Sequence, residues 1–203
     1  MRATLGVIVA GGRGTRLGPG PKALVVLDGR TLLERAIETL SLCCDDWIVA
    51  TAPDVELPVD GARLVRDAPG SGGPLAGVAA ALAAREPSDA LVLGVDFPLA
   101  RPRALAALAE RRGNAPAVLP APAGSPQPLA AAYGAEACAA LGRALAEGET
   151  SIRRAALALE PLILDDAALA ALEGGSETFF NVNTPADLAE AARLLAARAG
   201  APR

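Results

Sequence analysis

Short apolar runs and amphipathic segments alternate along this chain of 203 residues. The runs at residues 5–10, 47–50 and 90–95 are too short for helices and predict buried strands, and residues 62–65 are predicted to form a further strand. The segments 31–40, 73–85 and 102–112 are predicted to be helices. This alternation predicts an α/β fold, a Rossmann-like three-layer αβα sandwich with a mostly parallel central sheet.

Capping residues mark two of the helix starts. Thr31 has Glu34 three residues later, which is the capping-box pattern. Near the C-terminus, Thr184 is predicted to cap a helix that has Pro185 in its first position and Asp187 in its first turn.

The remaining segments complete one predicted domain. Further strands are expected at 24–27, 117–119, 129–133 and 161–164, with a Pro-rich loop at 120–128 and helices at 136–146 and 151–159. We expect a single domain over residues 1–203, with a nucleotide-binding part at about 1–100 and an acceptor-binding part at about 101–198.

Charge and composition exclude several classes of function. A net charge of −4 and 2% aromatic residues provide neither a basic stripe nor a stacking platform for nucleic acid. No apolar run reaches the roughly 18 residues of a membrane span, and no signal peptide precedes the first strand, so no membrane partner and a cytoplasmic location are expected. The chain has no histidine, which rules out Ser-His, Cys-His and His-metal chemistry.

A glycine-rich loop with several cations follows the first predicted strand. It runs from Ala10 through Gly11 and Gly12 to Arg16 and Lys22. Glycines let backbone N–H groups approach phosphate oxygens, and the cations favour a triphosphate or leaving pyrophosphate. The loop lacks the Gly-Lys-Ser/Thr of a Walker motif and the last glycine of a dinucleotide fingerprint. The alternative is a flexible surface loop.

Polar side chains also follow other predicted strands. Asp96 ends an apolar strand, where it can coordinate Mg²⁺ beside an anionic ligand or simply cap the next helix. Asp67 is in a similar position. In the segment 181–183, alternate strand positions place Asn181 and Asn183 on one face, where their amides can meet a ligand or cap a helix.

These residues together resemble the molybdenum cofactor guanylyltransferases, a branch of the nucleotidyltransferases. The resemblance runs nearly end to end and is carried by the 10–22 loop, Asp67, the Gly-Pro-Leu-Ala-Gly of 73–77, the Val-Asp-Phe-Pro-Leu of 95–99 and the segment 180–188. It implies transfer of GMP from GTP to the phosphate of molybdenum cofactor (molybdopterin), with release of pyrophosphate and Mg²⁺ as the cofactor.

The resemblance also implies roles for individual residues. The GTP-binding residues would be Val9, Ala10, Gly11, Gly12, Lys22, Asp67 and Asp96. The catalytic residues would be Arg16, Lys22 and Asp96, with Asp96 as the metal ligand, and Asn181 and Asn183 would face the acceptor. Transient contact with molybdoenzymes or cofactor-delivery proteins is a further implied partnership.

Three positions depart from this family's usual pattern. Pro21 stands before Lys22 where an Asp is usual, Ala50-Thr51 stands where a strand often ends in Asn, and Gln127-Pro128 replaces a frequent histidine. These departures leave open a cytidylyltransferase of the same cofactor or a sugar-phosphate nucleotidyltransferase. A non-catalytic nucleotide-binding regulatory subunit is the alternative from another class. A nicotinamide-dependent oxidoreductase is disfavoured, because the strand that begins at Trp47 has no acidic ribose ligand at its end.

Overall fold

The computed structural model describes residues 4–11, 17–67, 73–85 and 88–200. They form a seven-stranded sheet in the order β5-β4-β1-β6-β8-β7-β9. Its strands are β1 (Thr4–Val9), β4 (Asp46–Thr51), β5 (Leu64–Arg66), β6 (Asp89–Gly94), β7 (Ala117–Pro120), β8 (Ala130–Tyr133) and β9 (Leu162–Leu164). β1, β4, β5 and β6 are mutually parallel, and β8 runs antiparallel to its neighbours β6 and β7. The predicted α/β fold with a mostly parallel sheet is confirmed.

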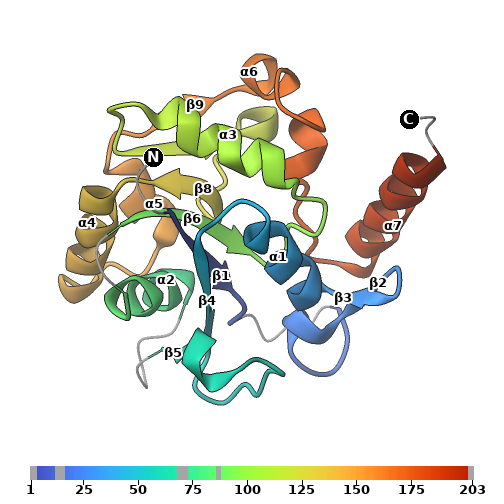
Figure 1. Cartoon of the computed structure of the whole chain (residues 1–203), viewed down its shortest axis with the longest axis horizontal. Coiled ribbons are helices and arrows are strands. Elements are labelled where there is room, and N and C mark those ends of the chain that lie inside the picture. Colours follow the sequence, from blue (N-terminus) through green and yellow to red (C-terminus); the bar gives the residue numbers. More distant parts are fainter. Residues whose placement is uncertain (1–3, 12–16, 68–72, 86–87, 201–203) are drawn as a thin grey trace.

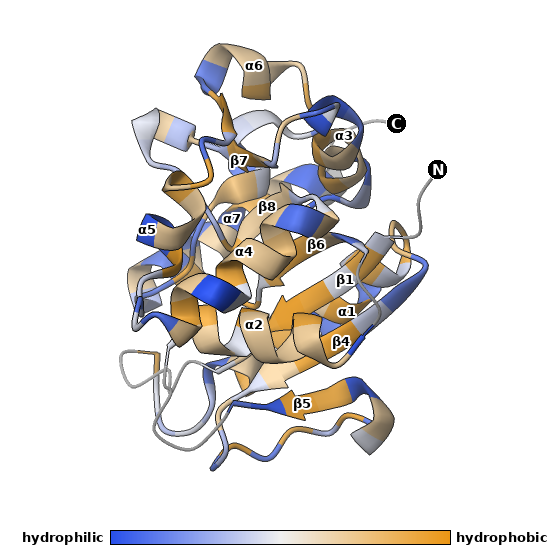
Figure 2. Ribbon diagram, turned by 90° about the vertical axis from the view of Figure 1, so that its left-hand side faces the viewer, coloured by the Kyte–Doolittle hydropathy of each residue, from blue (hydrophilic) through white to orange (hydrophobic). Residues whose placement is uncertain are grey.

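Helices cover both faces of this sheet. The helices α1 (Leu32–Ser41) and α3 (Pro102–Arg112) pack on one face together with part of α7 (Pro185–Gly200). The other face is covered by α2 (Pro74–Ala83), α4 (Ala135–Ala146) and α5 (Ile152–Leu157), and Figure 2 shows α2 and α4 in front of the apolar strands. Alternation along β1 explains this, because Ile8 enters the first core whereas Val7 and Val9 enter the second.

Most of the predicted elements are present. The helix α3 has the predicted bounds, and the Thr31–Glu34 capping box forms at the start of α1. The structure adds a short helix, α6 (Asp166–Ala170), and the 3-10 turns η3 (Pro122–Gly124) and η4 (Gly175–Phe179). Among the described residues, no helix is both long and apolar enough to cross a membrane.

Three strand predictions were wrong in part. Residues 24–27 contribute no strand to the main sheet. They belong to the 3-10 turn η1 (Lys22–Leu24) and to β2 (Val26–Leu27), which pairs with β3 (Arg30–Thr31) around the positive φ angles of Asp28 and Gly29. Residues 62–63 lie in the turn η2 (Gly61–Arg63), because the Asp60 side chain accepts the Ala62 N–H. Residues 181–183 belong to no strand.

Candidate functional site

The candidate site lies where the chain changes direction across the sheet. From β1 the chain proceeds outward to β4 and β5, and β6 then pairs with the other edge of β1. The carboxyl ends of the two central strands are joined by the Val95 N–H, which donates to the Val9 carbonyl at 3.1 Å. In open α/β sheets, ligands bind at such a topological switch point.

Four polar side chains meet beside these strand ends and form one linked group, which we call the polar ring. Lys22 Nζ donates to Asn183 Oδ1 at 2.8 Å, and Asn183 Nδ2 donates to Asn181 Oδ1 at 2.7 Å. The Asn181 side chain also lies near enough to Asp96 to favour its charged carboxylate, and Asp96 Oδ2 lies 3.8 Å from Lys22 Nζ. Three separate parts of the chain therefore meet at one point.

The backbone holds the two asparagines in this arrangement. The Val182 N–H donates to the Asp96 carbonyl at 2.8 Å, which fixes the segment between them. The Asn183 and Thr184 N–H groups donate to Asp187 Oδ2 at 2.9 and 2.8 Å, and the Asp187 N–H donates to Thr184 Oγ1 at 3.2 Å. Thr184 and Asp187 thus cap α7, as predicted, and the asparagine side chains take part in the polar ring and not in the cap.

Asp96 does not cap α3, the helix that follows it, so the helix-cap interpretation of this residue is wrong. The residue at the N-cap of α3 is Arg101, and no side chain makes a capping hydrogen bond there. The Asp96 side chain instead turns back over Gly94, where a methyl group would overlap Asp96 Oδ1. A glycine at position 94 is therefore required for this position of the carboxylate.

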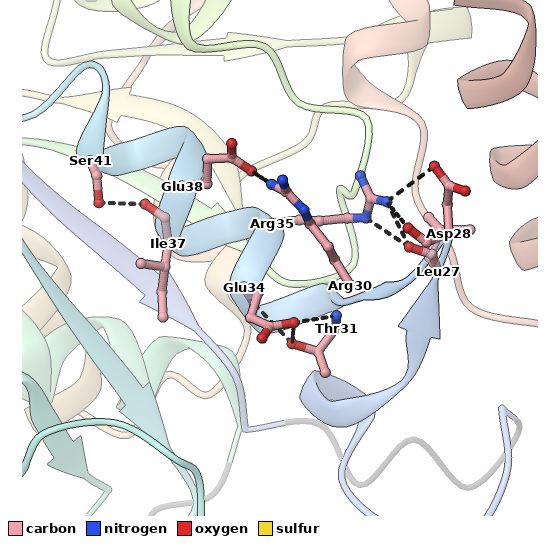
Figure 3. Close-up of polar contacts among 9 residues, drawn as sticks. All are labelled: Leu27, Asp28, Arg30, Thr31, Glu34, Arg35, Ile37, Glu38 and Ser41. Carbon is pink, nitrogen blue, oxygen red and sulfur yellow. Dashed lines mark hydrogen bonds and ion pairs between the residues drawn. The ribbon is translucent and has the colours of Figure 1, made fainter. Parts of the chain in front are cut away.

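Lys22 is positioned by the β2–β3 hairpin. The Leu32 N–H donates to the Val25 carbonyl at 2.9 Å, which ties the hairpin to the first turn of α1. Arg35 of α1 donates from Nε and Nη2 to the Leu27 carbonyl at 3.2 and 2.6 Å, as Figure 3 shows. A second contact joins the exposed side chains of Arg30 and Glu38. These contacts hold the turn that carries Lys22 against the body of the protein.

Burial and charge act in opposite directions in the polar ring. Burial raises the pKa of the Asp96 carboxyl, and the Lys22 ammonium and the Asn181 amide partly offset this. Burial also lowers the pKa of Lys22, against the attraction of Asp96 and Asp187. The two charges therefore stabilise each other in a site that would otherwise favour their neutral forms.

A second carboxylate lies on the opposite side of β1. Asp67 is 7% exposed, and its Oδ1 has no hydrogen-bond partner among the described residues. Burial raises the pKa of this carboxyl. A methyl group at Gly77 of α2 would lie 3.2 Å from Asp67 Oδ1 and 3.9 Å from Val9 Cγ1, so Asp67, Gly77 and Val9 border a common space.

The structure thus separates the predicted site residues into two groups. Lys22, Asp96, Asn181 and Asn183 are together in the polar ring. Val9, Ala10, Gly11 and Asp67 lie at the ends of the parallel strands or just beyond them, with the Ala10 N–H donating to the Ala50 carbonyl at 2.8 Å. Gly12 and Arg16 lie outside the described residues.

Two supporting residues were missed as parts of the site. Gly94 stands two residues before a strand-end aspartate, which is a pattern that could have suggested a close backbone approach. Asp187 was identified only by its place in the first turn of α7. The structure shows that its carboxylate also fixes the backbone of Asn183 and lies near enough to Lys22 to affect its charge.

The donor set is compatible with Mg²⁺ bound together with a phosphate ligand. The described residues contain no group of three or more His, Cys, Asp or Glu side chains that could hold a metal ion. Mg²⁺ bound beside substrate phosphates uses one or two carboxylates and keeps several waters, so it needs no such cluster. Asp96 supplies one carboxylate that is held in place by its neighbours.

Comparison with known proteins identifies the family. The model of the MobA-like NTP transferase domain matches residues 6–162. The chain belongs to this family. It is 40% identical to the molybdenum cofactor guanylyltransferase of Acidiphilium cryptum, over 92% of this chain and 94% of the relative. It is 35% identical to a probable molybdenum cofactor guanylyltransferase of Chloroflexus aggregans, over 90% of both.

A solved structure agrees with this family. The molybdopterin-guanine dinucleotide biosynthesis protein A of Archaeoglobus fulgidus superimposes with a TM-score of 0.77 at 25% identity, over 95% of this chain and 99% of that one. The chain is accordingly a nucleotidyltransferase, and the oxidoreductase alternative does not agree with its family.

Proposed function

We propose that this protein transfers GMP from GTP to the phosphate of molybdopterin, forming the guanine dinucleotide cofactor and releasing pyrophosphate. The observation that carries this proposal is the polar ring at the switch point, which places a lysine, an aspartate and two amides beside the ends of β1 and β6. The relatives named as molybdenum cofactor guanylyltransferases support the choice of GTP and of the acceptor.

The two groups of site residues suggest a division of the substrates. Val9, Ala10, Gly11 and Asp67 would hold GTP, with Gly12 and Arg16 assigned from the sequence motif alone. Asn181 and Asn183 would face the acceptor, and Lys22 and Asp96 lie between the two groups. In this proposal residues 1–100 bind mainly nucleotide and residues 101–198 mainly acceptor, within a single domain.

The reaction needs no histidine. The acceptor phosphate oxygen forms a bond to the α-phosphorus of GTP, and the bond from that phosphorus to the bridging oxygen breaks as pyrophosphate leaves. The second pKa of a phosphate monoester is about 6, so the nucleophile is already ionised near neutral pH and requires no general base. The task of the protein is therefore to align the reactants and compensate their charge.

Lys22 and Asp96 are suited to that task. Among the described residues, Lys22 uses one hydrogen bond, to Asn183, so its ammonium has further donors for phosphate oxygens. Asp96 would hold Mg²⁺, which when bound neutralises part of the phosphate charge. Asn181 and Asn183 keep the aspartate and the lysine in a common orientation.

The proposed product suggests which proteins this enzyme contacts. A dinucleotide cofactor is used by other proteins, so we propose transient contact with molybdoenzymes or cofactor-delivery proteins in the cytoplasm.

The test is pyrophosphate release with Mg²⁺ and each of GTP, CTP, ATP and UTP, with and without molybdopterin. We expect release with GTP only, and only when molybdopterin is present. Turnover with CTP or with a sugar phosphate would assign a different substrate to the same fold. Nucleotide binding without any turnover would instead indicate the regulatory alternative.

A further inference from the structure

We propose that a pocket beside Asn181 binds the flat heterocyclic end of the acceptor, and that the Asp166 carboxylate accepts hydrogen bonds from the N–H groups on the edge of this heterocycle. This inference rests on the proposed function and extends it to residues outside the polar ring. The pocket, which we call the ring pocket, has a volume of about 430 Å³ and is lined by Pro122, Ala123, Gln127, Asp166, Ser176, Glu177, Phe179, Phe180 and Asn181.

The ring pocket adjoins the polar ring because the two share Asn181. Its other lining residues come from η3, the loop before β8, α6 and η4, all in the part of the chain proposed to bind the acceptor. Its volume is in the range of small-molecule sites. Pro122 and Phe180 supply apolar surface, and both are partly exposed. A flat aromatic ligand can pack against such a surface.

The polar groups of the ring pocket favour a ligand that donates hydrogen bonds. Its lining includes two carboxylates and no lysine or arginine. Gln127 Nε2 donates to the Ser125 carbonyl at 3.2 Å, so its amide oxygen is left for a ligand. An anionic group would be repelled here, whereas a neutral ring with N–H groups would be bound.

Asp166 is the better placed of the two carboxylates. It accepts the Ala123 N–H at 3.2 and 3.1 Å and the Ser176 hydroxyl at 2.8 Å, which fix its orientation and leave further lone pairs. Glu177 is partly neutralised by Arg198, whose Nη2 lies 3.5 Å away. The fixed and less compensated charge is therefore that of Asp166.

These two neighbouring environments orient the acceptor. Lys22 is linked to Asn181 through Asn183 and attracts the phosphate, whereas Asp166 lines the ring pocket together with Asn181 and attracts N–H donors. The 2-amino-4-oxo edge of a pterin presents adjacent N–H groups, which match a carboxylate. The acceptor thus spans Asn181, with its phosphate in the polar ring and its pterin in the ring pocket.

The test compares two fluorescent ligands on the full chain. Pterin (2-amino-4-oxopteridine) carries the amino group, and lumazine (2,4-dioxopteridine) has an oxo group in its place. We expect pterin to bind at least about tenfold more tightly than lumazine, because a charge-assisted hydrogen bond is lost with lumazine. Asp166→Asn should remove this preference without changing the affinity for GTP.

Asp165→Asn is the matched control. It removes the same charge at the neighbouring position, where Asp165 caps α6 by accepting the Ala168 N–H at 2.9 Å, and asparagine caps helices equally well. This variant should keep the preference for pterin. Equal binding of the two ligands by the unaltered protein, no binding of either ligand, or a preference that survives Asp166→Asn would overturn the proposal.

Acceptor kinetics separate this inference from the proposed function. If pterin binds as expected but molybdopterin supports no pyrophosphate release, the proposed function fails and the ring pocket stands. If release from GTP requires molybdopterin but Asp166→Asn leaves the KM for molybdopterin unchanged, the ring pocket fails and the proposed function stands.

Discussion

Asp67 directly follows the parallel strand β5, and Asp96 lies two residues after the end of the parallel strand β6. The surroundings of the two carboxylates nevertheless differ. Both carboxyls have a pKa raised by burial. Asp96 is compensated by Lys22 and Asn181, whereas Asp67 Oδ1 has no hydrogen-bond partner in the described part of the chain. A buried acceptor without a partner costs stability until a ligand supplies a donor. Asp96 is thus held in place by protein groups, whereas in the proposed function a ligand would supply the donor that Asp67 lacks.

The largest effect is expected from Asp96→Asn. The amide keeps the size of the side chain but removes the charge that would hold Mg²⁺, so kcat should fall by about a hundredfold or more. Steady-state pyrophosphate release at several Mg²⁺ concentrations measures this. The control is Asp28→Asn, a change of an exposed residue at a positive φ that asparagine tolerates. Full activity of Asp96→Asn would contradict its role as a metal ligand.

Lys22→Ala should weaken GTP binding by about tenfold or more, because a cation facing the phosphates is lost. Titration calorimetry with GTP in the absence of acceptor gives this affinity, and Arg193→Ala, which removes an exposed cation that the proposed site does not use, is the control. An unchanged affinity would refute contact between Lys22 and the phosphates.

The same lysine substitution should change the pH dependence. Lys22 lowers the pKa of Asp96 against the effect of burial, so its removal raises that pKa further. Because the proposed role of Asp96 requires its charged carboxylate, activity should decline at a higher pH on the acidic side than in the unaltered protein. A pH profile of kcat for both proteins tests this direction.

Two glycine substitutions compare the surroundings of the carboxylates directly. Gly94→Ala forces Asp96 to move, so we expect about a tenfold or larger loss of kcat and a destabilisation of about 1–3 kcal/mol. In Gly77→Ala the added methyl group would lie 3.2 Å from Asp67 Oδ1, but alanine has a higher helix propensity than glycine in α2. The free energy of unfolding of this variant should therefore change by less than about 1 kcal/mol. Urea unfolding and kcat at saturating GTP distinguish the two. Equal losses from both substitutions would show that the two sites are equally constrained.

The smallest effect is expected from Asp67→Asn. Because the folded-state pKa of Asp67 is raised, the unaltered protein loses stability as the pH rises from the unfolded-state pKa of about 3.9 through the raised value. The asparagine variant avoids that loss. Its melting temperature should therefore exceed that of the unaltered protein at pH 7, with a smaller difference at pH 4, while its affinity for GTP falls. A variant that is less stable at pH 7 would show that the Asp67 charge has a partner.

Local sequence signals predicted much of the fold. β1 and β6 are continuous apolar runs, and α1 and α7 begin with side chains that cap their own backbone. These signals act over a few residues, so they can be recognised without knowledge of the fold. The errors at 24–27 and 62–65 occurred where turn geometry, through Asp28, Gly29 and Asp60, outweighed a short apolar pattern.

The site could be predicted only as a set of separate strand ends and loops. The sequence by itself determined that Asp96 ends an apolar strand, that Lys22 follows a glycine-rich loop, and that Asn181 and Asn183 precede a capped helix. Only the tertiary structure decided that Lys22 bonds to Asn183, 161 residues away, that Asp96 joins them, and that Asp67 lies apart without a partner for Oδ1 among the described residues. Capping and periodicity depend on neighbours along the chain, whereas burial, ion pairing and unmet hydrogen bonds depend on which distant segments the sheet brings together.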